Sequence, residues 1–339
     1  MAKKTNAALI SNAQSLLAHG GSPARMLAQN LMKSKDGKLN FNALRTNDVL
    51  RKDEWKLLDE VLVDVGRDLL VAANDLRAAG LVEQLGGIGI TLSEYEKISD
   101  MSAANVDFAA VTDGEKDSVT FTLVAVPVPI IHKDFSVNIR RLEASRGSQS
   151  HGQAIDRTQV EVAAIKVAES AEDMVFNGTP DTLVGNALYG YTNAPNRNTV
   201  TGGDWGTLAN TTANVITALS ASNADGYRGP YNLYVATTQY GQLREFYTDG
   251  SGHTGFDRVG TLVGGVNRIK SGDRLDDAEA VMVTMRRNVV DLAIGMDMTV
   301  VEWDSKGGLM FDFKVMTAVT IRVKDDQNSG SGVVHITGI

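Results

Sequence analysis

The chain has 339 residues, of which 43% are hydrophobic and 22% are charged, so it can bury a sizeable core in two or three domains. It contains no cysteine, which excludes disulfide bonds, thiolate metal sites and cysteine nucleophiles. No apolar run has the roughly 18 residues of a membrane span, and the opening of the chain does not form a signal peptide, so we expect a cytoplasmic protein.

Charge is unevenly distributed along the chain. Residues 1–52 carry nine Lys and Arg against Asp36 and Asp48, which gives +7, whereas the whole chain carries −8 and the remainder therefore −15. Glycines and turn residues break this basic arm into pieces that cannot form a core alone. Such an arm binds nucleic acid or the acidic surface of a neighbouring copy, and we favour the second. The expected contact residues of the arm are Lys33, Lys35, Lys38 and Arg45.

Residues 53–79 predict one amphipathic helix. Apolar residues from Trp55 to Leu76 recur at spacings of three and four, and Gly80 marks the end. The seam is heptad-like, but an ordinary core helix is the favoured interpretation over a coiled coil.

Residues 81–139 change to a strand pattern. A glycine-rich turn at 86–90 and a polar stretch at 92–118 precede alternating β-branched residues, which predict strands over 119–128 and 130–139. The apolar side chains of the first strand exceed what a free hairpin can bury, so they should find a partner on another chain. The candidate intersubunit contacts are Val119, Phe121, Leu123, Val126, Arg140, Arg141 and Arg146.

Residues 151–178 predict a single long helix. Apolar residues recur through it at helical spacing from Val160 to Val175, and Gly178 ends it. About 24 helical residues would span roughly 36 Å, longer than the usual helix of a compact domain. Beyond it, the pattern predicts helices at 208–220 and 238–247, a strand at 231–236, strands at 280–285 and 289–294, and a β block over 299–323.

The signals for catalysis are weak. The turn at 87–89 lacks the third glycine of a dinucleotide-binding loop, and Ser150 beside His151 is better explained by helix capping than by a nucleophile and its base. Glu169 and Asp173 lie one helical turn apart, where a solvated face is the simpler interpretation than a general acid and base. The five histidines have no metal-ligand spacing. We therefore expect no enzyme activity, catalytic residue, cofactor or metal.

Five short stretches, in this order, carry a family resemblance. They are Trp55-x-x-Leu58-Asp59, LEASRG at 142–147, AEDMVFNG at 171–178, GPYNL at 229–233 and LAIGMD at 292–297. With them, residues 53–339 resemble the encapsulins and the tailed-bacteriophage major capsid proteins, which share the Hong Kong-type capsid fold.

The resemblance implies an α+β fold with a defined order of parts. These are a basic N-terminal arm at 1–52, an amphipathic helix joining the peripheral domain at 53–87, an extended loop at 88–128, a peripheral domain with a long spine helix at 129–180, an axial domain at 181–286, and return strands of the peripheral domain with a C-terminal strand at 287–339. Some phage relatives also join a Lys of the extended loop to an Asn of a neighbour. Lys97 or Lys116 with Asn328 would be the pair here, but the turn at 113–117 looks exposed and we expect no such bond.

The function implied by the resemblance is that of a major capsid protein, which self-assembles into an icosahedral shell around a double-stranded DNA phage genome. The expected partners are other copies in pentamers and hexamers, packaged DNA bound without sequence specificity, and portal, scaffolding or decoration proteins, with no membrane. The location would be the virion capsid, assembled in the cytoplasm of a bacterial host. The alternative is an encapsulin-like nanocompartment shell that holds a cargo enzyme, although the long arm favours phage. A remote alternative is a hydrolase that uses Glu169/Asp173 or Ser150/His151.

Overall fold

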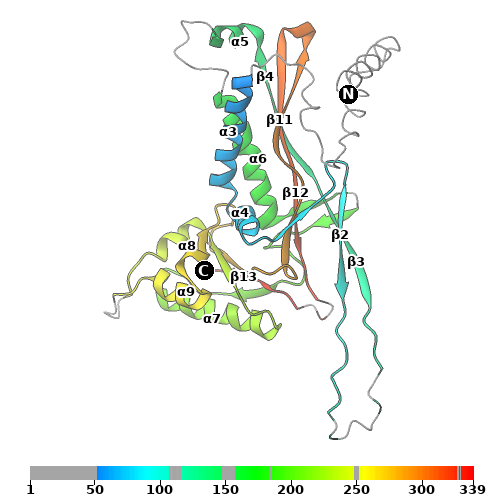
Figure 1. Cartoon of the computed structure of the whole chain (residues 1–339). Coiled ribbons are helices and arrows are strands. Elements are labelled where there is room, and N and C mark those ends of the chain that lie inside the picture. Colours follow the sequence, from blue (N-terminus) through cyan, green and yellow to red (C-terminus); the bar gives the residue numbers. More distant parts are fainter. Residues whose placement is uncertain are drawn as a thin grey trace, which may run out of the picture. The chain divides into compact units, whose positions relative to one another are not determined.

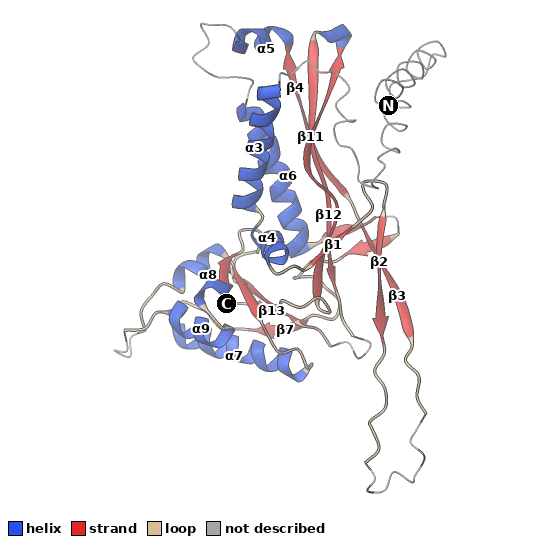
Figure 2. Ribbon diagram, viewed as in Figure 1, coloured by secondary structure: helices blue, strands red, loops and turns tan. Residues whose placement is uncertain are grey.

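The computed structural model describes residues 52–106, 108, 113, 116–146, 157–183, 185–247, 252–326, 328 and 330–339 (Figure 1). Helices and strands are both abundant in this part of the chain (Figure 2), as the α+β expectation requires. The contacts divide the chain into two compact units, the first formed by Met1–Leu58, Asp134–Arg157 and Val300–Lys314, and the second by Asp59–Lys133, Thr158–Thr299 and Val315–Ile339. The arm residues Lys33, Lys35, Lys38 and Arg45, and the pair Ser150 and His151, lie outside the described residues.

The first unit is small and consists mainly of a short helix and the ends of three strands. It contains helix α5 (Ile139–Arg146), the 3-10 turn η3 (Lys306–Gly308), and the ends of strands β4 (Ile130–Asn138), β11 (Val290–Ser305) and β12 (Met310–Val323). The rings of Phe135 and Phe313 stack with their centroids 5.1 Å apart, and Ile139 N donates to Leu309 O at 3.1 Å. These contacts join the start of α5 to the turn between the two long strands.

The second unit contains a five-stranded sheet in the order β7-β13-β10-β8-β9. Its strands are β7 (Asn198–Thr201), β8 (Tyr231–Val235), β9 (Ile269–Ser271), β10 (Glu279–Thr284) and β13 (Val333–Thr337). Every residue of β8 is buried, as expected of a near-continuous apolar strand inside a sheet. Helices α7 (Leu208–Ala224), α8 (Thr237–Gln242) and α9 (Gly255–Val263), with η2 (Val266–Arg268), accompany this sheet and enclose Trp205 in its core.

The predicted long helix is confirmed as α6 (Arg157–Asn177), whose buried stripe runs from Val160 to Phe176. Residues 147–156 lie outside the described part. Gly178 ends the helix with φ +66°, and a Cβ there would lie 2.4 Å from the Leu188 carbonyl oxygen. Only glycine combines that conformation with that close approach. The short strands β5 (Thr179–Leu183) and β6 (Asn186–Leu188) follow.

The single helix predicted over 53–79 is wrong, because the chain forms two helices. Helix α3 (Lys52–Leu69) and helix α4 (Val71–Ala78) are separated at Leu70, whose φ of −88° and ψ of 72° are not helical. The buried carboxylate of Glu172, on α6, accepts the Ala72 N–H at 2.6 Å. A side chain from another helix thus satisfies a donor at the new helix start, which makes the break possible.

Three other elements differ from the sequence prediction. Helix α8 ends at Gln242, earlier than predicted, and α9 was not predicted at all. The polar stretch that begins at 92 contains strand β2 (Leu92–Ile98), which pairs with β3 (Phe121–Pro127). The remaining strand, β1 (Val82–Gln84), lies beside β11 in a four-stranded sheet of order β1-β11-β12-β4.

Candidate assembly surface on the hairpin

Strands β2 and β3 form an antiparallel hairpin that belongs to the second unit (Figure 1). The register pairs Ile98 with Phe121, Glu96 with Leu123, and Ser93 with Val126. Side chains directly opposite one another lie on the same side of a sheet, and alternate residues lie on opposite sides. Ile98, Phe121 and Leu123 therefore share one face, and Ser93 and Val126 share the other.

The first of these faces is exposed and carries three large apolar side chains beside Glu94 and Glu96. Ile98, Phe121 and Leu123 leave 52%, 63% and 59% of their surface in contact with solvent. Three large hydrophobic side chains on one face of a two-stranded ribbon are a typical contact surface for another protein. Towards the hairpin tip, Met101 and Phe108 are also exposed. We call Ile98, Phe121 and Leu123 the hairpin face.

The other two predicted contact residues of this segment lie elsewhere. Val119 precedes β3 and is half-buried. Val126 lies on the opposite face, where it packs against the main hydrophobic core of its own chain. The structure thus places only Phe121 and Leu123 of the four apolar candidates on the hairpin face, where Ile98 joins them.

The predicted arginine contacts belong to the first unit. Arg140 and Arg141 lie in the first turn of α5 and are exposed, and Arg146 is its last residue. They stay candidates for contact with another copy. Lys97, the suggested partner of a covalent bond, donates through Nζ to Asp325 Oδ2 of its own chain at 2.8 Å.

The carboxylates considered for acid–base chemistry are each held by a local partner. Glu169 Oε2 accepts from Lys166 Nζ at 2.7 Å, a hydrogen bond that lowers the pKa of Glu169 below its ordinary value. Asp173 accepts from Asn177 Nδ2 at 2.8 Å. A general acid at neutral pH needs a raised pKa, so this arrangement does not favour the hydrolase alternative. Within the described residues, no group of three His, Asp or Glu could hold a metal, and none of the helices is long and apolar enough to span a membrane.

A cavity of about 550 Å³ in the second unit forms a second candidate surface. It lies beside the break between α3 and α4, and an ion pair between Arg77 Nη2 and Asp297 Oδ1, 2.8 Å long, borders it. Its apolar lining includes Leu62, Val63, Leu70, Val175, Leu292 and Val319. An apolar cavity with one charged edge suits an extended peptide segment that carries hydrophobic side chains.

Comparison with known proteins identifies the family of the chain. Residues 45–320 match the model of a family described as "Encapsulating protein for peroxidase". The type 1 encapsulin shell protein EncA of Myxococcus xanthus is 27% identical over 277 residues, which are 81% of this chain and 90% of that protein.

Solved structures show the same fold. A virus-like particle from Pyrococcus furiosus aligns with a TM-score of 0.60 and 17% identity, over 83% of this chain and 98% of that chain. The capsid of Myoviridae phage XM1 aligns with a TM-score of 0.57 and 15% identity, over 79% of this chain and 92% of that chain. The capsid fold expected from the sequence is confirmed.

Proposed function

This chain belongs to the family of encapsulating proteins, which form shells, and from that premise we propose that its copies close into a shell around a protein guest. The pentamers and hexamers suggested by the sequence are part of this proposal. Guest enzymes are proposed here because the matching family is described as "Encapsulating protein for peroxidase", and because the encapsulin shell protein EncA is 27% identical whereas the capsid of phage XM1 is 15% identical.

The observation that carries assembly is the hairpin face. Its three side chains remain exposed although they stand on paired strands, so folding of one chain does not bury them. A second copy of the same chain can bind this face, and the same contact then repeats from copy to copy. Contacts of this head-to-tail kind produce closed rings when the rotation between copies closes.

The cavity beside the α3–α4 break is the place we propose for guest docking. Val63 lines it and is itself exposed, so its side chain is accessible in the single chain. We expect Val63→Glu to leave shell formation unchanged but to reduce the amount of co-purifying guest, because a charge would replace apolar contact. Gel quantification of guest per shell measures this. An unchanged guest ratio would place the docking site elsewhere.

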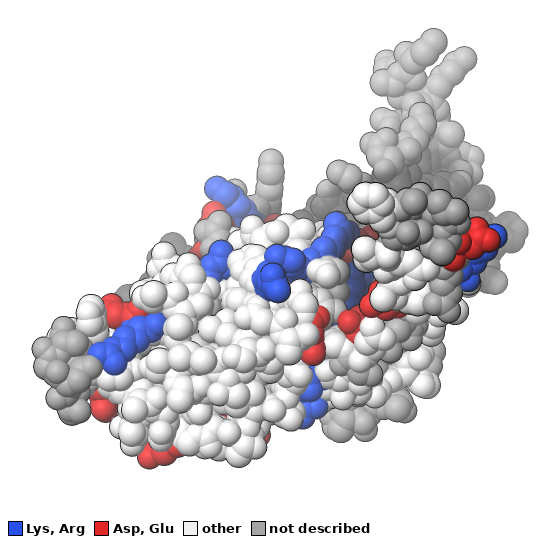
Figure 3. All heavy atoms as spheres, turned by 90° about the horizontal axis from the view of Figure 1, so that it is seen from below, with Lys and Arg blue, Asp and Glu red and all other residues white. Residues whose placement is uncertain are grey.

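A second candidate guest is a double-stranded DNA phage genome, with the shell as a virion capsid and portal, scaffolding or decoration proteins as partners. The observation that favours it is the +7 segment at residues 1–52, most of which precedes the family match at residue 45. On the face drawn in Figure 3, Lys and Arg form small separate groups among uncharged residues. Among the described residues drawn there, these groups form no continuous basic surface, and we propose that the arm would supply the phosphate contacts.

The contents of purified particles decide between the guests. Particles from the native source are treated with nuclease, imaged by negative stain, and analysed for protected DNA and for proteins by mass spectrometry. We expect uniform shells that contain a second protein and no protected DNA. Protected DNA of uniform length would replace the first candidate by the second, and a chain that forms no particles would contradict both.

A further inference from the structure

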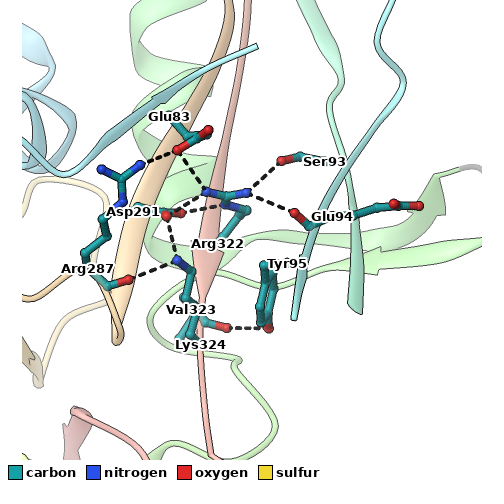
Figure 4. Close-up of polar contacts among 9 residues, drawn as sticks. All are labelled: Glu83, Ser93, Glu94, Tyr95, Arg287, Asp291, Arg322, Val323 and Lys324. Carbon is teal, nitrogen blue, oxygen red and sulfur yellow. Dashed lines mark hydrogen bonds and ion pairs between the residues drawn. The ribbon is translucent and has the colours of Figure 1, made fainter. Parts of the chain in front are cut away.

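A cluster of charged side chains lies between the hairpin and the core of the second unit (Figure 4). Asp291, on β11, is fully buried and accepts from Arg322 Nε and Nη2, each at 2.6 Å. Lys324 Nζ donates to the same carboxylate at 2.6 Å. A buried carboxylate needs such pairing, and the two-pronged contact fixes the plane of the guanidinium. Arg322 is therefore held rigidly from the core side.

Arg322 also reaches the hairpin with its remaining nitrogen. Nη1 donates to Ser93 Oγ at 3.1 Å and to the Glu94 carbonyl oxygen at 3.3 Å, both on β2. Ser93 is buried, whereas Glu94 exposes its side chain on the opposite face. One guanidinium thus connects a buried carboxylate of the core to the base of an exposed ribbon.

Two more contacts continue along the same face of β2. Tyr95 Oη donates to the Val323 carbonyl oxygen at 3.3 Å, and Lys97 Nζ donates to Asp325 at 2.8 Å. Burial raises the pKa of Tyr95 to about 12, so its hydroxyl keeps the proton that it donates. Residues 93, 95 and 97 alternate along the strand and share one side, opposite the hairpin face. Figure 4 shows the first two pointing towards β12.

We propose that Arg322 is a positioning residue for assembly, which together with Ser93, Tyr95 and Lys97 forms a polar latch that holds one side of the hairpin and thereby aims the hairpin face outward. The free subunit then presents this face in one direction before it meets another copy. A pre-oriented ribbon loses less conformational freedom on binding than a swinging one. The consequence for shells rests on the proposed function, whereas the orientation of the hairpin does not.

The test separates the latch from the core cluster. The triple variant Ser93→Ala, Tyr95→Phe, Lys97→Met removes the three side-chain contacts of the hairpin and leaves Asp291, Arg322 and Lys324 in place, while Arg322→Lys also removes the contact with the Glu94 carbonyl oxygen. Arg322→Lys keeps the positive charge but loses the fork. Arg287→Ala is the matched control, because Arg287 pairs with Glu83 in the same cluster and is exposed.

Orientation is measured by the distance between two spin labels. The chain has no cysteine, so Glu96→Cys on the hairpin and Ser220→Cys on α7 give one label pair without background. Labelled chains are diluted into unlabelled ones, so that distances within one chain dominate. Unlabelled variants are examined separately by circular dichroism and electron microscopy.

We expect one narrow distance for the parent and for Arg287→Ala. The triple variant and Arg322→Lys should lose this narrow peak, and the triple variant should keep its helical signal while losing uniform particles. A narrow peak in the triple variant would overturn the latch, and uniform particles despite a broad distribution would overturn its role in assembly. If the parent itself forms no particles, the proposed function fails, but the distance measurement still decides whether the latch exists.

Discussion

Phe121 leaves 63% of its surface exposed in the single chain, so its truncation removes little from the stability of the subunit. Buried in a contact between copies, the same ring would contribute about 2 to 3 kcal/mol at every repeat of the shell. We expect Phe121→Ala to yield folded subunits, judged by circular dichroism, and absent or deformed particles, judged by negative stain. Thr122→Ala is the control, because residue 122 lies on the opposite face of the same strand.

Two results would contradict this role of Phe121. Normal particles at normal yield from Phe121→Ala would show that the ring is no anchor between copies. Loss of the helical signal would show instead that it belongs to the subunit core.

Glu172 gives the subunit a pH dependence whose sign follows from its burial. Burial raises the pKa of its carboxyl from 4.5 to about 7, with nearby Asp75 adding to the rise and the Ala72 and Ala73 N–H groups opposing it. Between these values the unfolded chain releases a proton that the folded chain keeps. The free energy of unfolding should therefore fall as the pH rises from about 4.5 through about 7, by a limiting value of about 3 kcal/mol.

Glu172→Gln should remove this dependence, because the amide oxygen can still accept the Ala72 N–H but carries no titrating proton. Urea denaturation of subunits of both forms between pH 5 and 8 measures the difference. We expect the variant to be more stable than the parent at pH 8 and close to it at pH 5. Parallel curves for the two forms would show that Glu172 does not titrate in this range.

Sequence patterns predict the position of a single residue only where local composition and periodicity determine which side of its element it lies on. Phe121 and Leu123 are predicted as contacts because their segment carries more apolar side chains than a free hairpin can bury. Val126 shows the limit, since its register opposite Ser93 turns it towards the core. The latch was out of reach, because Arg322 meets Ser93 and Asp291 only after strands distant in sequence come together.

At the scale of elements, one amide side chain connects helices α3 and α4 across the break between them. Asn74 Nδ2, on α4, donates to the carbonyl of Gly66 in the last turn of α3 at 2.9 Å. We expect Asn74→Ala to lower the free energy of unfolding by about 1 kcal/mol, because that hydrogen bond is lost. Asn74→Asp, which keeps the shape but cannot donate, should cost at least as much. Stability equal to the parent in both variants would show that the bond contributes nothing.

Helix α9 and strand β2 were not predicted, because their local sequence signals were weaker than the loop-like composition around them. Helix α9 begins with a capping box in which Thr254 and Asp257 bond reciprocally, and the T-x-x-D spacing was present in the sequence. Its glycine-rich approach suggested a loop instead. Strand β2 alternates Glu94 and Glu96 with Tyr95 and Lys97, and its charged residues hid the period of two. The long apolar stripes of α6 and α7 were unambiguous, and both helices were predicted correctly.

At the scale of the whole molecule, charge opposes the assembly that the hairpin favours. The chain beyond residue 52 carries −15, so identical copies repel one another unless basic groups compensate. Apolar contacts at the hairpin face act only between surfaces that touch, whereas this repulsion acts over longer distances. The +7 segment at residues 1–52 is the compensating charge that the sequence offers.

We therefore expect a 53–339 fragment to form fewer shells than the full chain. Attraction between the arm and acidic neighbours is screened by salt, with a Debye length of about 10 Å at 0.1 M and about 3 Å at 1 M, so full-length shells should also dissociate more readily as salt increases. A further full-length variant keeps the arm but removes four of its positive charges, by changing Lys33, Lys35, Lys38 and Arg45 to Gln. It tests whether the arm acts through its charge. It should behave like the fragment if charge is the cause, and like the parent if the arm binds through its apolar residues. Light scattering across a salt series measures all three chains, and equal shell yield with equal salt resistance in all of them would remove the arm from assembly.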